Sequence, residues 1–146
     1  MTIFIRSALA VLFLDELVVG FWNQAFPASF YEHFPTVDLT PPFSEHYARD
    51  FGGATLGIAL LLGIAFVRPR AAYVVPAALA YSVFSVPHFV FHLEHLHGAS
   101  TGQAVFLTTA NAAVALLGFA AVAVATPRRR PAIGSPGSAG TPAVPR

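Results

Sequence analysis

Four apolar segments, each long enough to cross a lipid bilayer, constrain this chain more than any other feature of its sequence. A membrane-spanning helix needs about 20 mainly apolar residues, and in lipid it satisfies its backbone hydrogen bonds internally. The sequence therefore predicts an all-α fold, a four-helix transmembrane bundle formed by residues 1–126. The predicted spans extend from about Ile3 to Phe26, Asp50 to Val67, Ala71 to Phe91, and Ala104 to Thr126.

The composition excludes several classes of protein. With 55% hydrophobic and 10% charged residues, the chain has too little polar surface for a soluble enzyme of 146 residues. Cysteine is absent and the single methionine is residue 1, which excludes disulfides, thiolate nucleophiles, iron–sulfur clusters and methionine-ligated copper. A net charge of +1 provides no broad basic surface for nucleic acid, so the lipid bilayer is the expected partner.

The arginines predict the orientation of the bundle. Cytoplasmic loops of membrane proteins are enriched in Lys and Arg, and all the basic residues of this chain except Arg49 flank one set of span ends. Both termini are therefore expected in the cytoplasm, as in a multi-pass protein of the bacterial cytoplasmic (inner) membrane. The flanking arginines are Arg6, Arg68, Arg70, Arg128, Arg129, Arg130 and Arg146.

Two segments lie outside the predicted spans. The outer loop, residues 27–44, is rich in proline and aromatic residues and is expected to pack as a cap over the mouth of the bundle. Within it, Thr40 followed by Pro41 and Pro42 predicts the start of the second helix. Residues 127–146 are rich in Arg, Pro and Gly and are expected to form a disordered cytoplasmic tail.

Polar and small residues recur at helical spacing in every predicted span. Residues three, four and seven apart share one face of a helix, so each set should face the bundle interior. Given the predicted span directions, most of the polar residues in these sets lie in the outer half of the membrane, where they predict an outward-facing polar pocket. The sets are Glu16, Gly20 and Asn23; His46, Asp50, Gly53 and Gly57; Tyr81, Ser85, His88, His92 and His95; and Thr108, Asn111, Ala115 and Gly118.

The histidines support a metal site as one interpretation. His88 and His92, four residues apart, direct two imidazoles toward one point, and His46 with Asp50 would complete a first shell for divalent Zn, Fe, Mn or Cu. Bis-histidine haem between the second and third spans is a less favoured interpretation. In the structural alternative, these side chains form hydrogen bonds between helices and bind nothing.

Acidic residues near the bilayer centre are the second polar feature. A carboxylate at this depth is costly unless it is protonated, paired or hydrated. Of the adjacent Asp15 and Glu16, Glu16 shares a helix face with Gly20 and is expected to point inward. It is interpreted as a proton relay, a counter-charge for a cationic ligand, or a structural hydrogen-bonding group. The other predicted ligand-binding residues are Asn23 and Asn111, with Glu45 and Arg49 as an ion pair at the pocket rim.

Three sequence elements carry a resemblance to a known group. They are FYEHFP (30–35), SEHYARDFGG (44–53) and VPHFVFHLEHLHG (86–98). Together they resemble uncharacterised small four-helix integral membrane proteins of high-GC actinobacteria, over roughly residues 5–125. The second element matches the group's N-E-H-x-x-R-D-x-G pattern at Glu45, His46, Arg49 and Asp50 and departs from it at Ser44.

The layout is also distantly similar to DoxX-like proteins, some of which are associated with quinone or thiol oxidation. The resemblance implies the architecture and no reaction. The sequence leads us to expect a membrane protein whose pocket binds a metal or a small lipid-soluble ligand, such as a quinone or an isoprenoid, with a redox link and catalysis left open. The alternative is a non-catalytic subunit, in a homo-oligomer or a larger membrane complex, that packs through small residues such as Gly53 and Gly57.

Overall fold

The computed structural model describes residues 2–39 and 42–126, and this part of the chain is helical without any strand. The all-α prediction is therefore confirmed. The predicted disordered tail, residues 127–146, lies outside the described residues. The elements are α1 (Thr2–Ala25), α2 (Pro27–His33), the 3-10 helix η1 (Val37–Leu39), α3 (Glu45–Val67), α4 (Ala71–Glu94) and α5 (Thr101–Ala125).

Side-chain caps set the first residues of two long helices. The Ser44 hydroxyl accepts a hydrogen bond from the Tyr47 backbone N–H at 3.4 Å, so α3 begins at Glu45, five residues before the predicted span. The predicted start at Thr40-Pro41-Pro42 is not confirmed, since Pro42 precedes the helix, and Thr40 and Pro41 lie outside the described residues. Ser100 and Gln103 form a reciprocal capping box at the start of α5, with distances of 3.3 and 2.8 Å.

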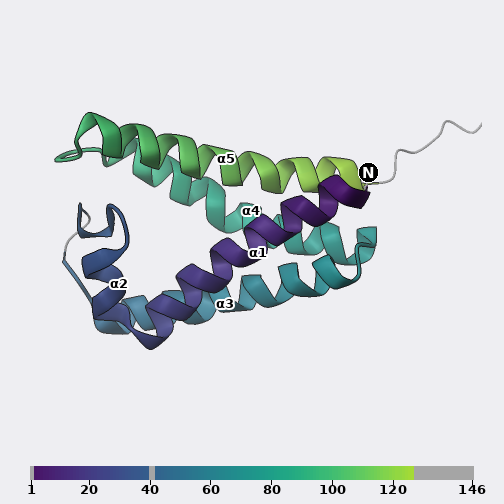
Figure 1. Cartoon of the computed structure of the whole chain (residues 1–146), viewed down its shortest axis with the longest axis horizontal. Coiled ribbons are helices and arrows are strands. Elements are labelled where there is room, and N and C mark those ends of the chain that lie inside the picture. Colours follow the sequence, from purple (N-terminus) through teal and green to yellow (C-terminus); the bar gives the residue numbers. More distant parts are fainter. Residues whose placement is uncertain (1, 40–41, 127–146) are drawn as a thin grey trace, which may run out of the picture.

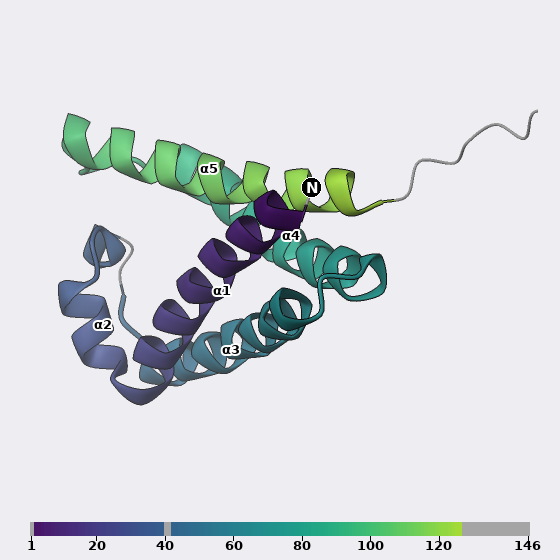
Figure 2. The ribbon, with the colours of Figure 1, turned by 45° about the vertical axis from the view of Figure 1, so that its right-hand side comes forward.

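The long helices form two pairs that diverge toward one end of the molecule. Helix α1 packs along α3, and α4 packs along α5 (Figure 1). The short connection between α3 and α4 keeps the pairs together at one end, and the turned view shows them separating toward the other (Figure 2). Helix α2 lies at this open end. Because α1 begins beside the C-terminal part of α5 and finishes beside α3, it links the two pairs.

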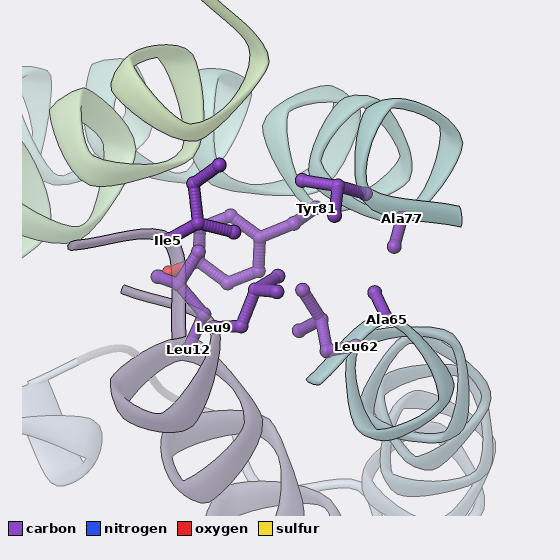
Figure 3. Packing of buried hydrophobic residues seen from close by; sticks show 8 residues of the cluster. Ile5, Leu9, Leu12, Leu62, Ala65, Ala77 and Tyr81 are labelled. Carbon is purple, nitrogen blue, oxygen red and sulfur yellow. The ribbon is translucent and has the colours of Figure 1, made fainter. Parts of the chain in front are cut away.

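The hydrophobic core fills the closed end. Its cluster joins three helices (Figure 3). Leu9, Leu12, Leu62 and Val74 are completely inaccessible to solvent. Close packing here fixes how the two pairs meet and leaves the space at the open end free for other groups. The other members of the cluster are Ile5, Ala65, Ala77 and Tyr81.

Glycines permit the close approach of α1 and α3. A Cβ on Gly20 would lie 2.6 Å from Thr55 Oγ1, and one on Gly52 would lie 2.6 Å from the Gln24 backbone nitrogen. The predicted inward face of α3 is therefore wrong. The set that includes Gly53 and Gly57 is exposed, and the buried set lies about 100° around the helix from it. The buried residues of α3 are Gly52, Thr55, Ala59, Leu62 and Ala65.

Three helices, α3, α4 and α5, are long and apolar enough to cross a membrane, so the chain is a membrane protein. Helix α1, with 24 residues, also has the length of a span. It is not one of these three helices, and it carries three charged residues, Arg6, Asp15 and Glu16. Three of the four predicted spans therefore meet the requirement of length and hydropathy.

Candidate ligand-binding pocket

A cavity of about 580 Å³ lies between the diverging helix pairs. Residues from all five α-helices line it, including Asn23 of α1, Phe30 of α2, Phe51 of α3, Ser85 of α4 and Asn111 of α5. Its volume is within the range of small-molecule sites. The cavity exists because the core holds the helices together at the opposite end.

Aromatic side chains of the predicted cap segment form one wall of the cavity. The rings of Phe30 and Phe34 stack with centroids 4.6 Å apart, and Trp22 of α1 meets Phe30 edge-on at 5.7 Å. Tyr31 and Phe43 pack together at 5.2 Å. Residues 27–44 thus contain α2 and η1, and these rings hold the segment against the helix bundle.

Two buried polar groups that line the cavity have no partners among the described residues. The Glu16 side chain is 2% exposed, and neither of its carboxyl oxygens has a hydrogen-bond partner among the described residues. Ser85 is 3% exposed, and its hydroxyl likewise has no partner there. Both residues line the cavity. Because an unpaired buried polar group is costly, these atoms indicate a place where a ligand or water would bind.

A hydrogen bond between α4 and α1 lies beside these groups. The Tyr81 hydroxyl donates to Asp15 Oδ2 at 3.3 Å, and both residues line the cavity. Sequence reasoning expected only Glu16 to point squarely inward, but the structure places both acids of the pair on the cavity wall. The widening space between the helix pairs accommodates two adjacent positions of α1 instead of one.

Two of the predicted histidines also lie on the wall. His88 and His92 meet edge-on with ring centroids 4.5 Å apart, and Phe84 packs against His88 at 5.1 Å. His95, the residue that follows the end of α4, is exposed and stacks on Phe91 at 3.9 Å. The polar set of α4 therefore lines the cavity from Tyr81 through Ser85 and His88 to His92.

Both predicted asparagines line the cavity. Asn23 is 4% exposed, and the Asn111 amide donates to the Leu107 carbonyl at 2.8 Å. This internal hydrogen bond occupies one amide donor of Asn111 and leaves its other donor and its oxygen available.

The predicted four-residue metal site is not assembled. His46 and Asp50 pair with each other at 3.3 Å, with side chains 86% and 69% exposed, and neither lines the cavity that contains His88 and His92. Among residues 2–39 and 42–126, no group of three or more His, Asp or Glu side chains is placed to hold a metal ion. The reason is that His46 and Asp50 lie on the exposed face of α3 and not on its buried face. For the same reason, His46 does not face His88 or His92 as the bis-histidine haem interpretation requires.

The predicted rim residues Glu45 and Arg49 form an ion pair that joins helix ends. Arg49 donates to Glu45 Oε1 at 2.8 and 3.0 Å and to the Gln24 carbonyl in the last turn of α1 at 2.5 Å. Neither residue lines the cavity. The guanidinium therefore satisfies a carbonyl at the end of α1.

Sequence reasoning missed the aromatic character of the site. Ten of the described lining residues are phenylalanine or tyrosine, among them Phe51, Phe84 and Phe91. The helical spacing of Tyr81, Phe84, His88 and Phe91 was a usable indication, because an aromatic residue adjoins each polar position of the α4 set.

No protein-family model, curated protein or solved structure matches this chain. Its resemblance to the actinobacterial group and to DoxX-like proteins therefore stays a prediction. The cavity combines two carboxyls, two imidazoles and the Ser85 hydroxyl with an aromatic wall.

Proposed function

We propose that this protein is a four-span protein of the bacterial cytoplasmic membrane whose pocket binds a small lipid-soluble ligand. The observation that carries the proposal is the position of Glu16. Its carboxyl group is buried and has no partner among the described residues, and it lines a cavity of about 580 Å³ whose lining includes ten phenylalanine and tyrosine residues. A buried charge or hydrogen-bonding group is stable only with a partner, and a bound molecule would supply one.

The surface of α1 supports its role as the fourth span. Asp15 and Glu16 are turned toward the cavity, whereas Val11, Leu14 and Phe21 are exposed on the outside of the helix. Lipid would contact an apolar surface, and the acids would stay inside the bundle. With the arginines on the cytoplasmic side, the open end and its pocket face outward.

The chemistry of the walls supports a lipid-soluble ligand. Phe30, Phe51 and Phe84 offer apolar contact to the body of such a molecule, while Ser85, His88 and Asn111 can form hydrogen bonds with its polar end. Quinones and isoprenoids are of this type and reach a membrane protein directly from the bilayer.

The cavity supports ligand binding over a purely structural role. A subunit that only packs against other helices would have no use for a cavity beside an unpaired acid. The exposed Gly53 and Gly57 offer a surface for a second copy or a partner subunit, which is compatible with the proposed pocket.

Photolabelling of the full chain in lipid vesicles tests the proposal. The probe is an isoprenoid alcohol that carries a diazirine, used with and without an excess of unlabelled farnesol. We expect saturable labelling, prevented by farnesol, on peptides that contain the cavity-lining residues of α4. Ala110→Trp should abolish it because Ala110 lines the cavity, whereas Ala113→Trp on the exposed side of α5 should not.

Two results would contradict the proposal. One is labelling that never saturates and is spread over the outer helix faces. The other is equal labelling of Ala110→Trp and the unmodified protein, with both variants inserted and helical by circular dichroism.

A further inference from the structure

The acid in the pocket has no cationic partner in the part of the chain that the structure describes. Glu16 is 2% exposed and both of its carboxyl oxygens are without hydrogen bonds among the described residues. Its neighbour Asp15 is already bonded to the Tyr81 hydroxyl. Removing a carboxylate from water without a counter-charge costs roughly several kcal/mol. The partner that Glu16 lacks is therefore expected to be a cation or a hydrogen-bond donor.

The described residues provide no permanent positive charge to pair with Glu16. The sequence contains no lysine, and no described arginine lines the cavity. Arg6 donates to the Phe66 carbonyl at 3.2 Å, and Arg49 bonds to Glu45. When ionised, the carboxyl groups of Asp15 and Glu16 make the pocket complementary to a positively charged ligand and unfavourable for an anion.

The walls of the cavity favour the same charge. Ten phenylalanine and tyrosine residues are among the described lining residues. The face of an aromatic ring carries negative potential and attracts ammonium groups, and the attraction is stronger where water is excluded. An apolar body would fill the space between these rings, as in other small-molecule pockets.

We infer that the ligand of this pocket is a hydrophobic amine, an inference that rests on the proposed function. The protonated nitrogen pairs with the Glu16 carboxylate, and the apolar body lies against the aromatic walls. The free hydroxyl of Ser85 accepts a second N–H from the amine.

Three probes of one shape but different charge test this inference. They are 1-adamantylamine, 1-adamantanol and adamantane-1-carboxylate, titrated by calorimetry into the full chain in lipid nanodiscs. We expect the amine to bind about tenfold more tightly than the alcohol, since the probes differ mainly in the ionic and cation–π contacts, and the carboxylate to bind most weakly. Empty nanodiscs correct for partition into lipid.

Paired variants assign the selectivity to one carboxyl. Glu16→Gln should remove the difference between amine and alcohol, and Glu94→Gln, at the exposed end of α4, should keep it. Equal affinities for the two probes in the unmodified protein would overturn the inference, as would selectivity that persists in a folded Glu16→Gln variant. If Glu16→Gln does not fold, the comparison of probes on the unmodified protein decides alone.

The two proposals can fail separately. Farnesol-sensitive labelling of the pocket together with no preference for the amine would retain the ligand site and reject the amine. If farnesol does not prevent labelling and the amine is not preferred, the pocket itself is rejected.

Discussion

Tyr81 and Asp15 connect the two helix pairs where they begin to diverge. The Tyr81 hydroxyl on α4 donates to Asp15 Oδ2 on α1 at 3.3 Å, while the Tyr81 ring belongs to the hydrophobic core. One side chain thus joins the closed end of the molecule to the polar part of the cavity. The hydrogen bond also fixes Asp15 against α4, whereas Glu16 has no partner among the residues that the structure describes.

Tyr81→Phe should destabilise the protein by about 1 kcal/mol, because it removes this hydrogen bond while keeping the ring. Unfolding by SDS in mixed micelles measures the change. Tyr73→Phe is the matched control, since Tyr73 lies at the surface of the same helix. Equal stabilities of the two variants would show that the bond contributes nothing.

Gly52→Ala should destabilise by about 1 to 3 kcal/mol, because the new Cβ would meet the backbone of α1 at Gln24 and Gly20. Gly57→Ala should be neutral or slightly stabilising, because among the described residues no atom outside its own stretch of helix lies within 4 Å of its Cβ position, and alanine favours a helix. The same unfolding assay compares them. The reverse order of stability would place the α1 contact on the other face of α3.

Leu62→Ala should cost about 2 to 5 kcal/mol, because Leu62 is completely buried in the cluster that holds the helix pairs together. Leu60→Ala provides the control, since Leu60 is 64% exposed on the same helix. Thermal unfolding followed by circular dichroism in detergent reports both. If Leu62→Ala lowers the free energy of unfolding no more than Leu60→Ala does, this cluster is not the core that holds the helices together.

His88→Ala should weaken binding of the isoprenoid probe about fivefold, through loss of one hydrogen bond and a ring contact inside the cavity. His46→Ala should leave binding unchanged, because its exposed side chain pairs with Asp50 outside the cavity. Probe concentration at half-maximal labelling is the measurement. Equal weakening by both variants, with a stoichiometric metal lost from each, would restore the four-residue metal site.

Helix-local properties could be predicted from the sequence. The apolar segments identified the long helices because length and hydropathy act within each segment. The spacing of Glu16, Gly20 and Asn23 correctly identified the buried face of α1. The α4 set was identified for the same reason, since its polar residues through His92 share one face and line the cavity.

The face of α3 could not be chosen in this way. Two sets of small residues, one with Gly52 and one with Gly53, lie next to each other on that helix. The polar residues His46 and Asp50 drew the prediction toward the second set, whereas contact with Gly20 and burial of Leu62 require the first. Local periodicity cannot rank two such faces, because the difference between them lies in the fit to another helix.

From the sequence alone came the helical class, the apolar segments and an acid facing inward on α1, since backbone hydrogen bonding and hydropathy are properties of neighbouring residues. Tertiary structure decided the rotation of α3, the divergence of the helix pairs and the aromatic lining of the cavity. These depend on how side chains from distant parts of the chain fill space together, and a close-packed core at one end determines what stays open at the other.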